Sequence, residues 1–288
     1  MFLNTEFIRL IELLEFPFMQ RALLGGILLG LLGGLLGSFA ILRQLSFFSH
    51  TVGHAALLGI VLGVLLNLDP TLTLLPFTVL FGLGVIYLIS QTDLWSDTVL
   101  NIVFSASLAL AIIALSFIQT YQGNLMNLLF GDILAIQGKD LGLSLAVLTL
   151  SVVSLGLTLR SQILLTLHEG MAKAQGVAVR LHQAWFVVLL SLAVAVAIKA
   201  VGVLLVNAFL VIPAATAKLL SRQFAVFILL STGVGAISAI LGIVSSAVLN
   251  LASGPSIVIA QFVLFLMAVV LSRLKKQQAR EAQSDMKQ

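Results

Sequence analysis

The sequence predicts an all-α membrane protein, a polytopic helical bundle with eight or nine transmembrane helices. Hydrophobic residues make up 60% of the 288 residues and charged residues only 9%, which lies far outside the composition of soluble domains. The apolar residues also fall in successive runs close to the roughly 20 residues that cross a bilayer as a helix. Strands of a membrane barrel would instead alternate over shorter segments.

The chain divides into three predicted regions. Residues 1–17 mix apolar positions with three glutamates and one arginine, and we expect an amphipathic helix on the membrane surface. Residues 18–273 form the transmembrane domain, and residues 274–288 form a polar cytoplasmic tail. The run 206–221 is the least regular of the nine predicted spans, which are 22–42, 50–67, 71–90, 98–118, 139–159, 183–205, 206–221, 224–249 and 256–272.

Lysine and arginine predict the orientation, because cytoplasmic loops are enriched in them. If the chain crosses the membrane nine times, the basic positions all lie on the same side of the membrane; they are Arg43, the loop 160–180, Lys218, Arg222 and the tail. The opposite loops have neither residue type; they lie around 67–71, 119–127 and 250–253. The tail is therefore predicted to be cytoplasmic and the amino-terminal helix to lie on the outer side.

Composition also limits the partners. The formal charge of +4 comes from basic residues that stand singly at the ends of apolar runs, so the lipid bilayer is the expected environment and no nucleic acid is expected to bind. The chain has no cysteine, hence no disulfide framework and no thiolate metal site. Any metal must be held by nitrogen and oxygen, and no permanently bound cofactor is expected.

The first predicted span contains six glycines between Gly25 and Gly37 at small-xxx-small intervals. In lipid, such a face lets helix backbones approach closely. We expect close packing there and no chemical role.

Two of the four histidines, His50 and His54, open the second span in "FFSHTVGHAALLG" (47–59). Four residues apart, they lie on one helix face and can share a divalent ion, since ionisable residues at membrane depth are functional candidates. The alternative is that both are merely hydrated near the cytoplasmic end. A membrane metalloprotease would need Glu directly after the first histidine, and Thr51 at that position disfavours proteolysis.

Two residues interrupt later apolar runs and are candidates for structural or pore positions. Lys199, in "AVAIKAVGVLLV", must either reach the head groups or find a partner. Pro213, in "IPAATAKLL", predicts a broken or tilted segment that lines a cavity or forms a packing kink.

The most polar internal stretch is "LHEGMAKAQGVAVRLH" (167–182). Helix-forming residues after Glu169 and a stop at Gly176 predict a short cytoplasmic helix. Such a helix suits docking to a soluble partner, and a solvated connector is the alternative.

Several of these stretches together resemble the permease subunits of ABC-type importers for zinc, manganese and iron, the ABC-3 family. The resemblance covers about residues 18–271, and five motifs in the family's order and spacing make it specific. They are "GSFAILRQLSFFSHTVGHAALLG" (37–59), "LLFGDILAI" (128–136), "EGMAKAQGV" (169–177), "VGVLLVNAFLVIPAATAKLL" (201–220) and "SGPSIVIA" (253–260).

The resemblance implies a pore domain that works as a homodimer in a bacterial inner membrane. Each copy would dock on a cytoplasmic ABC ATPase, and an extracytoplasmic metal-binding protein would deliver the ion. The chain itself would be no enzyme, since it lacks the phosphate-cradling loop G-x-x-x-x-G-K-[ST]. Glu169, Ala172 and Gly176 fall in the family's coupling helix, and Asp132 falls in a further family signature.

The resemblance also implies a metal path through His50, His54, Asn124 and Asn250. The family usually has Asp at the position of His50 and of both asparagines, so each departure replaces an anionic oxygen with a neutral group. Imidazole suits zinc better than manganese, which favours oxygen ligands. We therefore expect zinc as the transported ion; the alternatives are manganese or iron import, and a membrane scaffold without ion flux.

Overall fold

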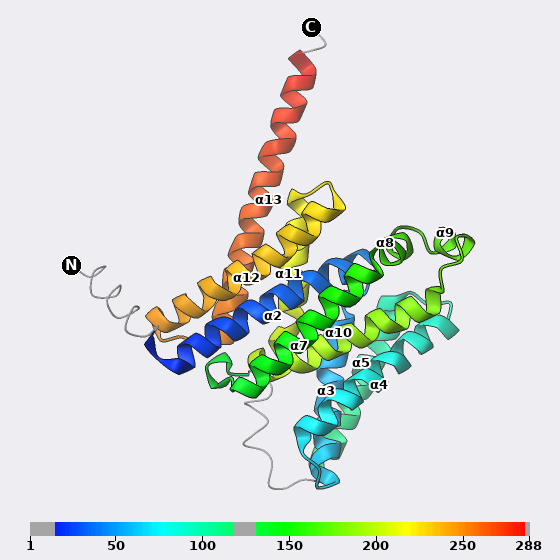
Figure 1. The fold of residues 1–288 in the computed structure, drawn as a ribbon, viewed down its shortest axis with the longest axis vertical. Helices are drawn as coiled ribbons and strands as arrows, with labels where there is room; N and C mark the ends of the chain where they lie inside the picture. Colours follow the sequence, from blue (N-terminus) through cyan, green and yellow to red (C-terminus); the bar gives the residue numbers. More distant parts are fainter. Residues whose placement is uncertain (1–14, 118–130, 286–288) are drawn as a thin grey trace, which may run out of the picture.

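The computed structural model describes residues 15–117 and 131–285, and these form a helical bundle (Figure 1). Within this part of the chain, eight helices are long and apolar enough to span a membrane. They are α2 (Pro17–Leu42), α3 (Phe48–Leu65), α4 (Pro70–Gln91), α5 (Ser96–Ser116), α7 (Gly138–Leu157), α10 (Val179–Val201), α12 (Phe224–Leu249) and α13 (Ser253–Asp285). The predicted all-α fold is confirmed.

The remaining described elements are one turn and three helices. They are the 3₁₀ turn η1 (Ile133–Ala135) and the helices α8 (Leu159–Leu167), α9 (Glu169–Ala174) and α11 (Val203–Leu220). Helix α11 corresponds to the least regular predicted run, 206–221, and it packs against α2, α3, α12 and α13. It therefore lies inside the bundle.

Of the two forms predicted at Pro213, broken or tilted, the broken segment is wrong, because α11 continues through this residue. The chain breaks instead at Gly202, which separates α10 from α11 with φ +78°, a conformation that glycine adopts without a steric penalty. Pro213 has no N–H to offer the carbonyl of Phe209. That oxygen faces Gly33 of α2, where an added Cβ would lie 2.5 Å from it.

The glycines of α2 bring its backbone against the backbones of α11 and α12, which confirms the predicted close packing. Gly33 and Gly37 face α11, and Gly30 and Gly34 face α12. The hydroxyl of Ser231 in α12 donates a 2.6 Å hydrogen bond to the carbonyl of Gly34. Helix α2 therefore packs closely against α11 and α12.

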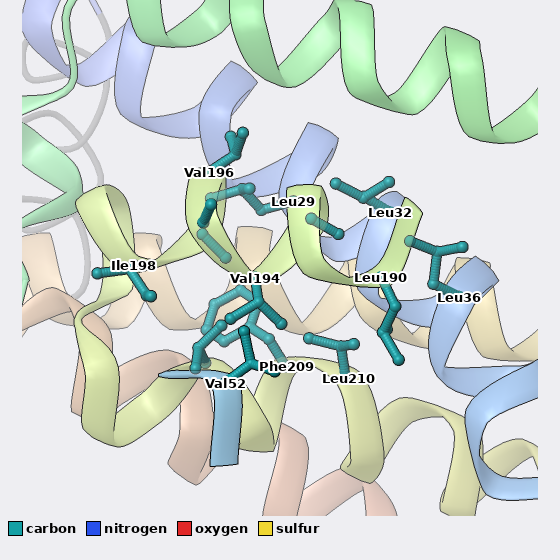
Figure 2. Packing of buried hydrophobic residues seen from close by; sticks show 14 of the residues in the cluster. Leu29, Leu32, Leu36, Val52, Leu190, Val194, Val196, Ile198, Phe209 and Leu210 are labelled. Carbon is teal, nitrogen blue, oxygen red and sulfur yellow. The ribbon is translucent and has the colours of Figure 1, made fainter. Parts of the chain in front are cut away.

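The apolar core lies where α2, α3, α10 and α11 meet (Figure 2). Most of the spanning part of α2, α3 and α10 is buried, whereas in α4, α5, α7, α12 and α13 less than a third of it is buried. The labelled core residues in Figure 2 come from all four central helices: Leu29, Leu32, Leu36, Val52, Leu190, Val194, Val196, Ile198, Phe209 and Leu210. The exposed outer helices are apolar, as expected for surfaces that face lipid.

The two predicted end regions have different outcomes. Most of the predicted amphipathic helix 1–17 lies outside the described residues, and Pro17 is the first residue of α2, a position that proline favours. Helix α13 continues to Asp285 and projects beyond the other helices in Figure 1. The predicted tail 274–288 thus begins within this helix.

Candidate functional site

The histidine pair occupies the first two turns of α3 and is enclosed by aromatic rings. The ring centroids of His50 and His54 lie 4.6 Å apart. Phe104 of α5 lies 4.9 Å from the first imidazole and 5.0 Å from the second, and Phe47 lies 4.8 Å from His50. The two imidazoles therefore lie next to each other on one face of α3 and both contact Phe104, as the spacing of four predicts.

The two histidines differ in exposure. His54 is 8% exposed, and its Nδ1 atom is buried without a hydrogen-bond partner. His50 is partly exposed. Buried polar atoms in folded proteins nearly always have a partner, so the unpartnered Nδ1 atom of His54 is a candidate ligand atom. Burial of His54 argues against the alternative of a merely hydrated pair.

The polar groups next to the pair are already occupied. The hydroxyl of Ser49 donates to Oδ1 of Asn207 in α11 at 2.6 Å. The buried hydroxyl of Thr51 is 3.1 Å from the carbonyl of Phe47 and 3.3 Å from that of Leu100. Thr51 therefore closes the position where a metalloprotease would hold its general base.

In residues 15–117 and 131–285, no three His, Cys, Asp or Glu residues come together as a metal cluster. The pair offers two neutral nitrogen ligands, and a divalent ion there would complete its coordination with water or with groups from another chain. Such partial coordination suits an ion in transit, because conduction needs binding weak enough for release.

The structure does not place Asn250 beside the histidine pair, and Asn124 lies outside the described residues. Asn250 ends α12 in the left-handed conformation, with φ 50° and ψ 44°, which asparagine tolerates better than most residues. It lines a cavity of about 350 Å³ between the start of α2, η1 and the end of α12. No residue of α3 lines that cavity.

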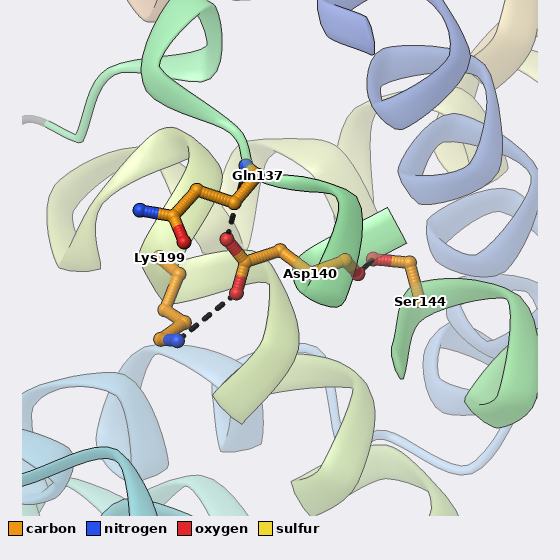
Figure 3. A network of polar contacts seen from close by, with 4 residues as sticks. All are labelled: Gln137, Asp140, Ser144 and Lys199. Carbon is orange, nitrogen blue, oxygen red and sulfur yellow. Dashed lines mark hydrogen bonds and ion pairs between the residues drawn. The ribbon is translucent and has the colours of Figure 1, made fainter. Parts of the chain in front are cut away.

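Lys199 forms an ion pair with Asp140. Its Nζ atom lies 3.0 Å from Oδ1 of Asp140, whose Oδ2 accepts a hydrogen bond from the Gln137 backbone N–H at 3.2 Å (Figure 3). The last turn of α10 is thereby tied to the first turn of α7. The lysine and the carboxylate also sit at the helix ends whose dipoles favour their charges. Sequence reasoning missed Asp140, although it is the only carboxylate at the start of that span.

Asp132 has a local role in the turn before α7. Its Oδ1 atom accepts a 3.0 Å hydrogen bond from the backbone N–H of Leu134, which caps η1. The side chain is exposed.

The predicted short helix after Glu169 is confirmed as α9, which lies beyond α8 at one end of the bundle (Figure 1). Glu169 and Lys173 form an exposed ion pair of 2.7 Å, whereas Ala172 is fully buried. Gly176 has φ +76° and ends the helix. Met171 is 53% exposed, so α9 presents an apolar side chain at its surface.

Arg43 joins the end of α2 to α8, and sequence reasoning had used it only for orientation. Its Nε atom donates to the hydroxyl of Thr166 at 3.1 Å, and Nη2 donates to the carbonyl and the side-chain oxygen of Gln162. Its guanidinium carbon lies 4.4 Å from the ring centroid of Phe186 in α10. Burial lowers the pKa of Arg43 to about 10, so the side chain stays cationic at neutral pH.

Arg43 also lies close to α9, since it lines a cavity of about 220 Å³ together with Glu169. Five residues beyond Arg43, Phe48 starts α3 and the histidine pair follows. Arg43 therefore contacts α8, lines a cavity with Glu169 of α9, and precedes the histidine helix by five residues.

Comparison with known proteins gives consistent matches. The family described as "ABC 3 transport family" matches residues 15–272. The chain is 32% identical to the manganese transport system membrane protein MntC of Listeria innocua, over 90% of this chain and 92% of that protein. It is 36% identical to the high-affinity zinc uptake system membrane protein ZnuB of Buchnera aphidicola, over 88% of this chain and 96% of that protein.

A solved structure shares the fold. PsaBC from Streptococcus pneumoniae in complex with Fab matches with a TM-score of 0.80 and 32% sequence identity, covering 91% of this chain and 95% of that chain. The agreement extends from the sequence motifs to the arrangement of the helices. The chain belongs to the ABC 3 transport family.

Proposed function

We propose that this chain is the membrane permease subunit of an ATP-driven importer for a divalent transition metal, with zinc as the ion. The observation that carries the proposal is the His50–His54 pair, with its buried and unpartnered nitrogen. Among the described residues no third His, Cys, Asp or Glu joins the pair.

Zinc follows from the ligand type. Imidazole nitrogen suits zinc, whereas manganese favours carboxylate, carbonyl and water. The pair supplies nitrogen, and no carboxylate joins it among the described residues. Manganese is the second candidate, because relatives of comparable identity are named for manganese and for zinc.

The pair forms half of a path that two copies of the chain complete. Each copy supplies two nitrogens, and tetrahedral zinc takes four ligands. Two facing pairs, or one pair with water, would carry the ion without trapping it. The copies lie side by side in a bacterial inner membrane, and a metal-binding protein on the outer side delivers the ion.

Energy enters at α9, which docks on a separate cytoplasmic ATPase subunit. Exposed Met171 and the Glu169–Lys173 pair form the docking surface, while buried Ala172 anchors the helix to the body of the protein. Displacement of α9 reaches α3 through the contacts of Arg43 with Gln162. The ATPase thereby shifts the path between outward-open and inward-open states.

The test is uptake of zinc-65 and manganese-54 into vesicles that contain the chain with its ATPase and binding protein. We expect His50→Ala and His54→Ala to reduce zinc uptake at least tenfold. His182→Ala is the matched control, because this imidazole is hydrogen-bonded to the backbone carbonyl of Ala178 at the start of α10, and uptake in this variant should be unchanged.

Each rate is divided by the amount of assembled complex, so a folding defect is separated from a transport defect. Zinc uptake that stays at the wild-type rate in both variants would remove the pair from the ion path. If the wild type takes up manganese but not zinc, the chain is still a metal permease, and manganese is its transported ion. A chain without flux would show no uptake of either ion, and Gly176→Ala would then have no effect.

A further inference from the structure

An apolar groove runs along the outside of the bundle between α2, α7, α8 and α12. Its volume is about 500 Å³, and every residue that lines it is apolar. The rim is open to the surroundings, because Val152 is 52% exposed and Leu229 is 71% exposed. Surface of this kind in a membrane protein faces hydrocarbon chains.

A second cavity, of about 240 Å³, lies at one end of the groove and is basic. Lys218 and Arg222 line it, and no carboxylate does. Both basic side chains are exposed, and neither forms an ion pair with any residue of the described ranges 15–117 and 131–285. The cavity therefore presents two positive charges without a protein counter-charge.

The groove and the basic cavity form one continuous slot. Phe224 lines both of them. On α8, Leu159 and Ile163 line the groove and Leu167 lines the basic cavity. These residues are spaced by four, so they follow one helix face, which rises about 12 Å at 1.5 Å per residue.

We propose that this slot binds one anionic phospholipid of the cytoplasmic leaflet. An acyl chain lies in the groove beside Phe224, and the phosphate group is held by Lys218 and Arg222. The charge complementarity selects this occupant, since basic pockets between helices on the cytoplasmic side suit anionic head groups. Arginine adds paired N–H donors that match phosphate oxygens.

The position of the slot gives the lipid a structural connection to the transport machinery. Leu167 is the last residue of α8 and lies two residues before α9. Leu42 of α2, which also lines the basic cavity, directly precedes Arg43. A bound lipid therefore contacts both helix ends that Arg43 joins.

The test measures lipid binding to the full-length chain by native mass spectrometry. The purified protein is titrated with phosphatidylglycerol and with phosphatidylcholine that carry the same acyl chains. Each basic residue near an anionic head group contributes about a factor of five, so we expect phosphatidylglycerol to bind about tenfold to thirtyfold more tightly. The double variant Lys218→Gln/Arg222→Gln should lose this preference.

The matched control is Arg273→Gln/Lys275→Gln, which removes the same charge from exposed positions of α13 that line neither cavity. It should keep the preference. If both double variants lose the preference for phosphatidylglycerol equally, only the overall charge of the protein attracts the lipid. If the Lys218/Arg222 variant keeps the preference, the anionic lipid binds at another place on the protein. Either result overturns the proposal.

A second pair of variants tests the groove without touching the charges. Ala225→Trp fills the groove, whereas Val226→Trp puts the same ring on the next residue, which does not line it. We expect the first variant to weaken phosphatidylglycerol binding at least fivefold and the second to leave it unchanged. Equal binding in both would show that no acyl chain occupies the groove. Loss of bound lipid on adding the ATPase subunit would mean that protein covers the basic cavity instead.

Discussion

Replacing Gly235 by alanine should separate α12 from α2, because the backbone of Gly30 in α2 occupies the place of the added Cβ. An added Cβ would lie 2.8 Å from the carbonyl carbon of Gly30 and 3.3 Å from its Cα. Carbon atoms in contact are normally about 3.5–4.0 Å apart. The two helices would have to move apart by about 1 Å at this point.

The expected cost follows from two contributions. Overpacking of this kind costs about 1–3 kcal/mol, and the nearby hydrogen bond from Ser231 to Gly34, 2.6 Å long, would stretch. Hydrogen bonds between membrane helices contribute about 0.6 kcal/mol on average. We therefore expect Gly235→Ala to lower the free energy of unfolding by about 2–3 kcal/mol.

The assay is unfolding in mixed micelles with increasing sodium dodecyl sulfate, followed by circular dichroism. The matched control is Gly233→Ala on the same helix, where an added Cβ has no atom within 4 Å and the change should stay within about 0.5 kcal/mol. If the two variants unfold at the same detergent fraction, the backbone contact between α2 and α12 does not limit the packing, and the reasoning fails.

Three further predictions test other contacts. Lys199→Met should destabilise the protein by about 1 kcal/mol, since the Lys199–Asp140 ion pair is partly exposed. A double-mutant cycle with Asp140→Asn measures the coupling energy between the two side chains, and a value near zero would contradict the ion pair. Arg43→Lys keeps the charge but loses the paired donors, so zinc uptake per ATP hydrolysed should fall several-fold, and an unchanged ratio would exclude Arg43 from coupling. Gly176→Ala forces a φ of +76° on a residue with a Cβ, which costs about 1 kcal/mol, so this variant should bind the ATPase more weakly in a pull-down. Gly170→Ala adds a Cβ with only ordinary contacts, and its ATPase binding should be unchanged.

The helical bundle could be predicted from the sequence because membrane spans depend on local composition. A helix in lipid satisfies its own backbone hydrogen bonds, so a run of apolar residues of the right length is enough to predict it. The start of α12 at Phe224 and its end at Leu249 agree with the predicted run 224–249. The stop at Gly176 was equally local, because it depends on one residue's backbone conformation.

The candidate site was only partly predictable. The spacing of four placed His50 and His54 on one face of α3, and the structure keeps them 4.6 Å apart. Their enclosure by Phe104 depends on how α5 packs against α3, and nothing in either segment alone encodes that contact. The same limit explains why Asn250 was grouped with the histidines, although its helix end lines a different cavity.

The sequence by itself determined the class of protein, the approximate positions of the membrane spans and the neighbouring placement of His50 and His54, because each depends on composition or on short-range spacing. Tertiary structure alone decided which side chains meet. Lys199 finds Asp140 across 59 positions of the chain, and Arg43 reaches Gln162 across 119. Such contacts arise when separate helices pack, and helix packing in lipid is governed by the shapes of whole surfaces, which no single stretch of sequence contains.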